Sequence, residues 1–190
     1  MKMPNPVNST SIAKPAAPGR RRLLYTAVAG GAVAAGLGLA RCNEAGRGAE
    51  SSSLAGLWSL SFEVPDQPAL RMLTFAGRPL LLNFWATWCP PCVEEFPLLD
   101  RFFQQNSGKG WQVLALAADQ AKAVGAFLQR IPVHFPVALA GLEGITLSKS
   151  LGNSGGGLPF SLVLGSSGQV LQRKIGRISP DELERWSALG

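Results

Sequence analysis

From residue 58 onward, hydrophobic side chains recur with two different periods, and these periods alternate along the chain. Residues 80–86 and 111–118 are almost continuously apolar, which is typical of strands buried on both faces. Residues 92–105 and 121–130 instead place apolar side chains at helical spacing along one face. The order strand, helix, strand, helix predicts a sheet with helices packed on both of its faces.

Two weaker elements are predicted on the N-terminal side of this core. Residues 58–64 alternate weakly between apolar and polar side chains, which predicts a strand ending at Pro65. Residues 70–75 are expected to form its partner strand. Together they predict a β-hairpin that extends the core.

The next elements are a short helix and a second hairpin. The helix is predicted at residues 145–151, where a glycine-rich stretch ends it. Residues 160–164 and 169–175 flank the tight turn Ser166-Ser167-Gly168, which predicts two antiparallel strands.

A last helix is predicted at residues 180–189. Ser179 is a preferred N-cap residue, and Pro180 suits the first helical position. The complete pattern predicts an α/β fold in which a mixed central sheet is flanked by helices.

The N-terminal part differs in composition from the rest of the chain. Residues 1–22 lack an apolar period and are expected to be a disordered, basic, cytoplasmic segment. Residues 23–40 carry no charge, and as a helix they would span roughly 27 Å of a bilayer. They are predicted to be a signal anchor or an export signal cleaved near Ala40, with residues 41–56 as a flexible linker and 57–190 as the folded domain.

Other interpretations of this segment stay open. The run Arg20-Arg21-Arg22 resembles a twin-arginine export signal, and a buried helix of a soluble protein is the plainest alternative. Cys42 follows the segment and is either a lipidation site or an unpaired thiol in a linker.

Charge narrows the choice of partners. The net charge of +6 lies entirely in residues 1–41, which hold six basic side chains and no acidic one. Residues 42–190 hold 12 basic and 12 acidic side chains, so the predicted domain has no electrostatic preference for phosphates. We therefore expect no nucleic-acid partner.

The chemistry is expected at Trp88-Cys89-Pro90-Pro91-Cys92. Two cysteines separated by two residues, after a buried strand and at the start of a helix, are typical of a redox dithiol. The helix N-terminus carries unpaired N–H groups and about half a positive charge, which favours a thiolate on Cys89. Cys92 lies further into the helix and is expected to be the more shielded thiol.

Metal sites and peroxidase chemistry are the alternatives. Zinc needs four ligands, and the chain offers at most Cys42, Cys89, Cys92 and His134. A copper-binding assembly factor would use the two cysteines and His134, although His134 is more simply explained as a partly buried strand or loop residue. A peroxidase would work through Cys89 alone.

Two segments resemble a known family. Residues 81–92, Leu-Leu-Asn-Phe-Trp-Ala-Thr-Trp-Cys-Pro-Pro-Cys, resemble the active-site strand, turn and helix of the thioredoxin superfamily. Residues 157–164, Gly-Leu-Pro-Phe-Ser-Leu-Val-Leu, are similar to its Gly-x-Pro segment. The likeness is greatest to the TlpA/ResA-type, membrane-tethered disulfide reductases of the bacterial periplasm. It implies a thioredoxin-like fold for residues 57–190.

The resemblance implies a role for each matching residue. Cys89 would be the attacking thiolate and Cys92 the resolving thiol. Pro159 would be a cis-proline that faces the cysteines, and the backbone of Leu158 would pair with the client chain like an added strand. Trp88, with Pro90 and Pro91, would shape the surface that the client contacts.

Glu95 matches a glutamate that some of these reductases place behind the dithiol. It would accept the proton of Cys92, whereas the neighbouring Glu94 is expected to be solvated. Asn83 departs from thioredoxin, which has an aspartate at this position, and an amide cannot take up a proton. The role of general base therefore falls to Glu95, to water or to no group, and the alternative for Glu95 is a solvated helix residue. Phe160 stands where the family often has Thr or Glu, which leaves the preferred substrate open.

The two prolines between the cysteines bear on the redox potential. Neither has an N–H, so the turn offers the Cys89 sulfur fewer donors than a Gly-Pro pair would. A less stabilised thiolate predicts a reductant, nearer about −250 mV than about −120 mV. An oxidant or isomerase of the same fold remains the alternative.

The resemblance also implies partners. Outside the cytoplasm, a reductase needs a membrane electron donor of the DsbD/CcdA kind to restore its dithiol. Its clients would be disulfide-bearing proteins such as apocytochrome c or copper-site assembly proteins. The prediction requires no cofactor and no metal, and it locates the protein in the periplasm.

Overall fold

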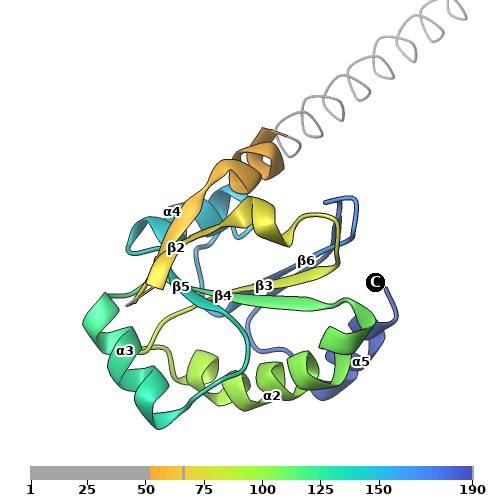
Figure 1. Cartoon of the computed structure of the whole chain (residues 1–190). Helices are drawn as coiled ribbons and strands as arrows, with labels where there is room; N and C mark the ends of the chain where they lie inside the picture. The colour runs from red at the N-terminus through yellow and green to blue at the C-terminus, as the bar shows by residue number, and fades with distance from the viewer. Residues whose placement is uncertain (1–51, 66, 190) are drawn as a thin grey trace, which may run out of the picture. The chain divides into compact units, whose positions relative to one another are not determined.

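The computed structural model describes residues 52–65 and 67–189 (Figure 1). Residues 52–59 are helical. The elements that follow are β1 (Ser61–Val64), β2 (Gln67–Arg71), the 3-10 helix η1 (Met72–Phe75), β3 (Leu80–Trp85), α2 (Pro90–Asn106), the 3-10 helix η2 (Ser107–Lys109), β4 (Gln112–Ala117), α3 (Ala121–Arg130), β5 (Val137–Leu139), α4 (Glu143–Ser150), β6 (Phe160–Leu164), β7 (Val170–Ile175) and α5 (Pro180–Ser187).

The strands form one mixed sheet in the order β2-β1-β5-β4-β3-β6-β7. The central strand β3 is parallel to β4 and antiparallel to β6. β4 and β5 are also parallel, whereas the pairs β6–β7, β1–β5 and β1–β2 are antiparallel. The predicted mixed sheet with an antiparallel final hairpin is therefore confirmed.

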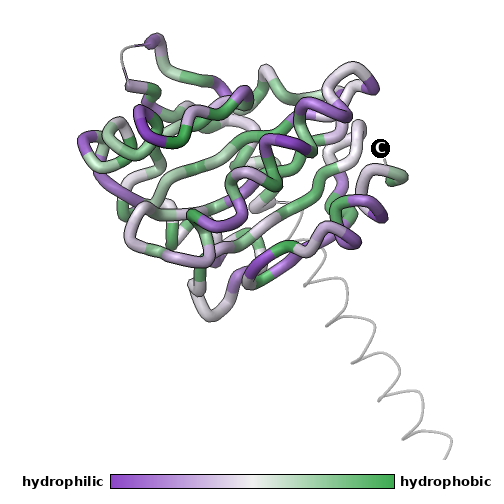
Figure 2. Tube along the Cα trace, turned by 90° about the horizontal axis from the view of Figure 1, so that it is seen from below, coloured by the Kyte–Doolittle hydropathy of each residue, from purple (hydrophilic) through white to green (hydrophobic). Residues whose placement is uncertain are grey.

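The two faces of β3 belong to two apolar cores. Leu81 and Trp85 face α2, α3 and α5, and Leu80, Leu82 and Phe84 face α4 and the helical residues 52–59 (Figure 1). Because successive side chains of a strand point to opposite faces, a strand covered on both sides is apolar at nearly every position, and in β3 Asn83 is the one exception. Burying each of these large side chains contributes roughly 1.5–3 kcal/mol. Figure 2 shows the hydrophobic central strands behind helices whose outer faces are hydrophilic.

The N-terminal extension differs from the prediction. Residues 52–59, which include the end of the predicted linker, are helical, so β1 begins at residue 61 rather than 58. Leu57 is buried there, and Leu54 and Trp58 pack on the same core, which is the i, i+3, i+4 spacing of a helix face. The predicted strand at residues 70–75 is also wrong in part, because β2 ends at Arg71 and a 3-10 turn follows.

The rest of the chain follows the prediction, with one omission. Helix α3 and strand β6 have the predicted bounds, and the other predicted elements of this part are shifted by one or two residues at their ends. Ser179 caps α5 as expected, because its side chain accepts a hydrogen bond from the Glu182 N–H. Strand β5 was not predicted, since it has only three residues and directly follows Pro136.

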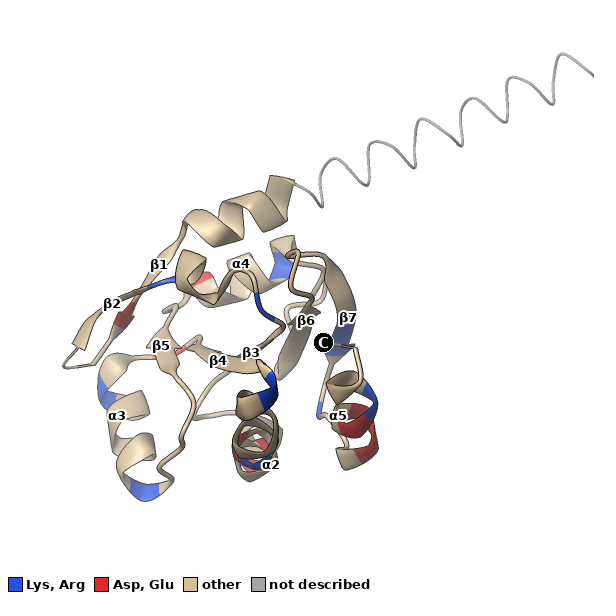
Figure 3. Cartoon of the chain, turned by 45° about the vertical axis from the view of Figure 1, so that its right-hand side comes forward, with Lys and Arg blue, Asp and Glu red and all other residues tan. Residues whose placement is uncertain are grey.

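The expectations for residues 1–51 lie outside the described residues. Within residues 52–65 and 67–189, no helix is long and apolar enough to cross a membrane. Both signs of charge occur on the helices here, for instance on α2 and α5 (Figure 3).

Candidate active site

Cys89 and Cys92 lie where the buried strand β3 passes into α2. Cys89 is the N-cap of α2 in an extended conformation, and Cys92 lies in the first helical turn. Their sulfurs form a disulfide of 2.08 Å, with 5.3 Å between the Cα atoms. Cys89 is 4% exposed, whereas Cys92 is 0% exposed, so Cys92 is the more shielded residue, as predicted.

The first turn of α2 offers few hydrogen-bond donors. Pro90 and Pro91 occupy the first two helical positions and have no N–H. The next two N–H groups, of Cys92 and Val93, both donate to the Cys89 carbonyl at 3.0 and 3.2 Å. In many helices, the N–H groups of the first turn are free to bind an anion. In α2, the residues at these positions leave no such N–H group free.

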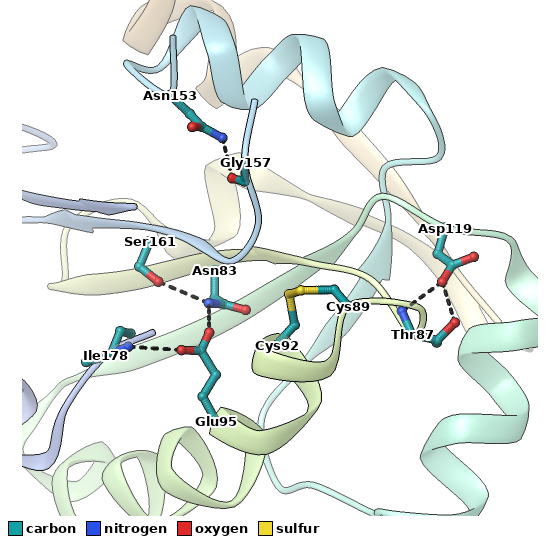
Figure 4. The surroundings of a disulfide bond; sticks show 10 residues. All are labelled: Asn83, Thr87, Cys89, Cys92, Glu95, Asp119, Asn153, Gly157, Ser161 and Ile178. Atoms are coloured by element: carbon teal, nitrogen blue, oxygen red, sulfur yellow. Dashed lines mark hydrogen bonds between the residues drawn. A yellow bond between two sulfur atoms is a disulfide. The ribbon is translucent and has the colours of Figure 1, made fainter. Parts of the chain in front are cut away.

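A side-chain clamp holds the turn before the cysteines. Asp119 Oδ2 accepts hydrogen bonds from the Thr87 backbone N–H at 2.8 Å and from Thr87 Oγ1 at 2.5 Å (Figure 4). Asp119 follows β4, so the clamp joins the carboxyl ends of two neighbouring parallel strands. Neither residue was predicted from the sequence.

A cis-proline stands at the start of β6. The Leu158–Pro159 peptide is cis, as the resemblance implied, and Pro159 is buried while Leu158 is half-buried. Phe160 pairs with Phe84 near the end of β3, so the segment before it lies at the sheet end that carries the dithiol turn. The Pro159 carbonyl accepts a hydrogen bond of 2.8 Å from the Gly176 N–H.

Asn153 shapes the loop that leads to this proline. Its side chain is buried, and its Nδ2 donates to the Gly157 carbonyl at 2.9 Å (Figure 4). The same nitrogen donates to Ser148 Oγ at 3.1 Å. Because Gly157 is two residues before Pro159, Asn153 helps to fix the loop next to the dithiol. This residue was also missed, and a single asparagine in a glycine-rich stretch gave no signal.

Glu95 lies one helical turn after Cys92 and points into the protein. It is 1% exposed. Its Oε1 accepts a hydrogen bond of 2.7 Å from Asn83 Nδ2, and its Oε2 accepts one of 3.1 Å from the Ile178 N–H (Figure 4). Burial raises the pKa of Glu95 to about 7, although both hydrogen bonds and the charge of Arg177 favour the ionised form.

The adjacent Glu94 has the opposite environment. It is exposed, as predicted, and its Oε2 lies 2.7 Å from Arg177 Nη1. Because successive helix residues differ by about 100°, one carboxylate faces water and the other faces the protein interior. Near pH 7, Glu95 therefore changes its protonation state readily.

Asn83 connects the carboxylate to the sheet. It is 0% exposed, and its Nδ2 also donates to Ser161 Oγ at 3.0 Å from the paired position on β6. Both amide hydrogens are thus used. Its Oδ1 is buried and has no hydrogen-bond partner among the described residues.

The surface around the disulfide is partly apolar. Trp88 is 63% exposed, Pro90 is exposed and Pro91 is half-buried, so all three reach the surface. Ile175 is also exposed and lies beside Gly157 in the loop before the cis-proline. Ile175 was not singled out from the sequence, because it ends a strand with no motif around it.

His134 is not part of this site. It lies exposed in a loop, where its Nδ1 is 2.9 Å from Asp100 Oδ2. It lines a groove of about 890 Å³ to which neither cysteine contributes. Among the described residues, no three His, Cys, Asp or Glu side chains are grouped to hold a metal. The copper alternative therefore lacks its third ligand, and the partly buried position expected for His134 is wrong.

Comparisons with known proteins agree with this geometry. A family model described as Redoxin matches residues 64–186. Thiol-disulfide oxidoreductase ResA of Bacillus cereus is 36% identical over 111 residues, which are 58% of this chain. The matched segment spans 62% of the length of that relative.

Solved structures show the same fold. The thiol:disulfide interchange protein, thioredoxin family protein from Chlorobium tepidum TLS has a TM-score of 0.61 and 27% identity, over 69% of this chain and 92% of that one. StoA from Bacillus subtilis has a TM-score of 0.55 and 20% identity, over 67% and 95% of the two chains. The thioredoxin-like fold predicted from the sequence is thereby confirmed.

Proposed function

This chain belongs to the Redoxin family as a ResA-type member of the thioredoxin superfamily, and we propose that it reduces disulfides in client proteins by thiol–disulfide exchange. The observation that carries the proposal is the Cys89–Cys92 pair at the N-terminus of α2, with the buried Glu95 one turn behind it. A dithiol, a nearby base and an accessible rim are the parts that such an exchange needs.

In the first step, the Cys89 thiolate attacks one sulfur of the client disulfide. A bond forms between Cys89 and that sulfur, the client S–S bond breaks, and the second client sulfur leaves as a thiolate that takes up a proton. Cys89 is suited to this role because it is the N-cap residue and the less shielded of the two cysteines.

In the second step, Cys92 resolves the mixed disulfide. Glu95 takes the Cys92 proton, the Cys92 sulfur bonds to Cys89, and the client sulfur leaves with the electron pair. The client gains two electrons, and the chain is left as the Cys89–Cys92 disulfide. A carboxylate with a pKa of about 7 suits this transfer, because it is partly ionised at neutral pH and binds a proton readily.

We propose that the client lies across the rim around the disulfide. Trp88, Pro90 and Pro91 contact it from one side, and the backbone of Leu158, before the cis-Pro159, pairs with it as an added strand. Support comes from the exposure of Trp88 and from the position of the Leu158–Pro159 peptide at the start of β6.

The number of hydrogen-bond donors at the start of α2 bears on whether the chain reduces or oxidises its clients. Pro90 and Pro91 remove two N–H groups that would otherwise stabilise a Cys89 thiolate. A less stabilised reduced form gives up its electrons more easily, so we propose a reductant near about −250 mV. A strong oxidant needs the reverse, a reduced form that its surroundings stabilise.

We propose a periplasmic location, tethered by residues 23–40 or reached by export with cleavage near Ala40. The three arginines before this uncharged segment support the orientation. A membrane electron donor of the DsbD/CcdA kind then regenerates the dithiol, and apocytochrome c or copper-site assembly proteins are the proposed clients. The copper-binding alternative is not favoured by any observation of the described residues.

Reduction of a disulfide-bonded peptide by the reduced full-length chain tests the proposed activity. A Cys42→Ser chain keeps the dithiol as the sole source of electrons, and the same chain with Cys89→Ser is the matched control. Stoichiometric reduction by the first and none by the second is expected. Equal rates in both chains would show that the dithiol does not carry the activity.

A further inference from the structure

Asn83 has one buried polar atom that the proposed mechanism does not use. Its amide hydrogens bond Glu95 Oε1 at 2.7 Å and Ser161 Oγ at 3.0 Å. Its Oδ1, by contrast, is buried without a partner among the described residues. Figure 4 shows the amide nitrogen of Asn83 directed at Glu95 and its oxygen on the side of the cysteines.

The partners of Asn83 fix the direction of its amide. When Glu95 is ionised, its carboxylate only accepts hydrogen bonds, so the Nδ2 side must face it. The opposite orientation would place Oδ1 against the Glu95 carboxylate oxygen. A buried carbonyl oxygen without a hydrogen-bond donor lowers the stability of the fold by about 1–3 kcal/mol. The unpaired Oδ1 of Asn83 therefore needs an explanation.

The oxidation state of the neighbouring cysteine supplies that explanation. In the disulfide, Cys92 carries no hydrogen and has nothing to donate. Reduction by two electrons and two protons breaks the S–S bond and gives Cys92 an S–H group. Cys92 is 0% exposed, so water does not readily supply an acceptor for that hydrogen.

We propose that Asn83 Oδ1 accepts the S–H of Cys92 when the pair is reduced, so that one amide holds both the resolving thiol and its base. This inference rests on the proposed function and adds a positioning residue to it. Asn83 does not take the proton. The proton passes from Cys92 to the Glu95 carboxylate as the sulfur bonds to Cys89, and Asn83 Oδ1 is again without a donor in the product.

The proposal also accounts for an amide at this position. An aspartate would add a second carboxylate beside Glu95 and would lose the donor that holds Oε1. A leucine of similar size would lose both contacts. An amide can donate to an ionised base and accept from a thiol at the same time.

Infrared spectroscopy of the S–H stretch tests the contact directly. In the full-length chain with Cys42→Ser and Cys89→Ser, Cys92 is the only thiol, and a hydrogen-bonded S–H absorbs at lower wavenumber than a free one. We expect the S–H band to lie at lower wavenumber in the chain that keeps Asn83 than in the Asn83→Leu chain. Asn83→Asp keeps an acceptor and should keep the low band, and Ser161→Ala, the matched packing control, should keep it too.

The resolving rate gives a second readout. A mixed disulfide of Cys89 with a small chromogenic thiol releases that thiol when Cys92 attacks. Losing the hydrogen bond in Asn83→Leu should slow this release about tenfold, which corresponds to roughly 1.4 kcal/mol. If circular dichroism shows that Asn83→Leu is unfolded, Asn83→Ala serves in both measurements.

Equal S–H bands in the Asn83 and Asn83→Leu chains would overturn this inference. They would leave the proposed function intact, because the infrared measurement does not depend on turnover. Conversely, a wild-type chain that fails to reduce a disulfide peptide overturns the proposed function, whatever the position of the band.

Discussion

Glu95 Oε2 accepts a hydrogen bond of 3.1 Å from the backbone N–H of Ile178, a residue 83 positions further along the chain. The loop between β7 and α5 therefore holds the carboxylate that lies behind Cys92. Because burial outweighs this hydrogen bond, the pKa of Glu95 is raised to about 7. Several measurable properties of the protein follow from this arrangement.

Replacing the resolving thiol should trap the client. The Cys92→Ser and Cys89→Ser variants are made in the Cys42→Ser chain, so that Cys89 and Cys92 are its only cysteines before substitution. In Cys92→Ser, Cys89 still attacks a client disulfide, but no second sulfur releases the product. We expect a mixed disulfide that is stable on non-reducing gels and disappears with dithiothreitol. A Cys89→Ser chain should form none. Sustained peroxide consumption by Cys92→Ser would instead favour the peroxidase alternative.

Glu95→Gln should change the pH dependence of the resolving step. In the wild type, the rate rises with pH as Glu95 ionises and levels off above about pH 7. The variant should lose this inflection and should be about 10²-fold slower at pH 7.5. Glu94→Gln is the matched control, because Glu94 is exposed, and it should retain the inflection. An unchanged profile in Glu95→Gln would show that another group takes the proton.

Glu95 should also make stability depend on pH. Its pKa is about 7 in the folded protein and near 4.5 when unfolded, so between these values the folded state binds more protons. Stability is therefore lost as pH rises from about 4.5 to 7, by up to about 3 kcal/mol. Urea unfolding of the oxidised wild type and Glu95→Gln measures this difference. Parallel curves across the whole range would contradict it.

The clamp before the cysteines should contribute to stability. Thr87→Val keeps the shape of the side chain and the backbone hydrogen bond but removes the one from Oγ1 to Asp119. We expect a loss of about 1–2 kcal/mol in the free energy of unfolding, because the acceptor is charged and partly buried. Thr74→Val, which removes an exposed local hydrogen bond, should change it by less than about 0.5 kcal/mol. Equal losses of unfolding free energy in the two variants would mean that the hydrogen bond from Thr87 to Asp119 stabilises the fold no more than an exposed local one.

The sequence predicted the parts of the fold that local patterns determine. Apart from Asn83, residues 80–85 are apolar on both faces because both faces are covered, and this pattern is visible without a structure. Strand β5 has only three residues, and its place depends on pairing with β4 and β1, which are distant in sequence. The predicted strand continues through residues 72–75 because Leu70 and Met72 have strand spacing, whereas the structure buries Met72 and Phe75 at the spacing of three that a 3-10 helix gives.

The candidate site was predicted unevenly for similar reasons. The cysteines carry a strong spacing signal, and the cis-proline followed from the resemblance. The contrast between Glu94 and Glu95 depends on the loop at Ile178, which no local pattern encodes. The Thr87–Asp119 clamp had one available signal, since Asp119 directly follows a strand predicted to be buried.

The central claim is that Cys89 and Cys92 form a reducing dithiol. The most direct test is the equilibrium potential of the Cys42→Ser chain in glutathione buffers, with free thiols trapped before analysis. We expect a value near about −250 mV, and in any case at or below about −220 mV. A value of about −150 mV or higher would show that the chain is an oxidant or isomerase, and that Pro90 and Pro91 do not lower the potential as proposed.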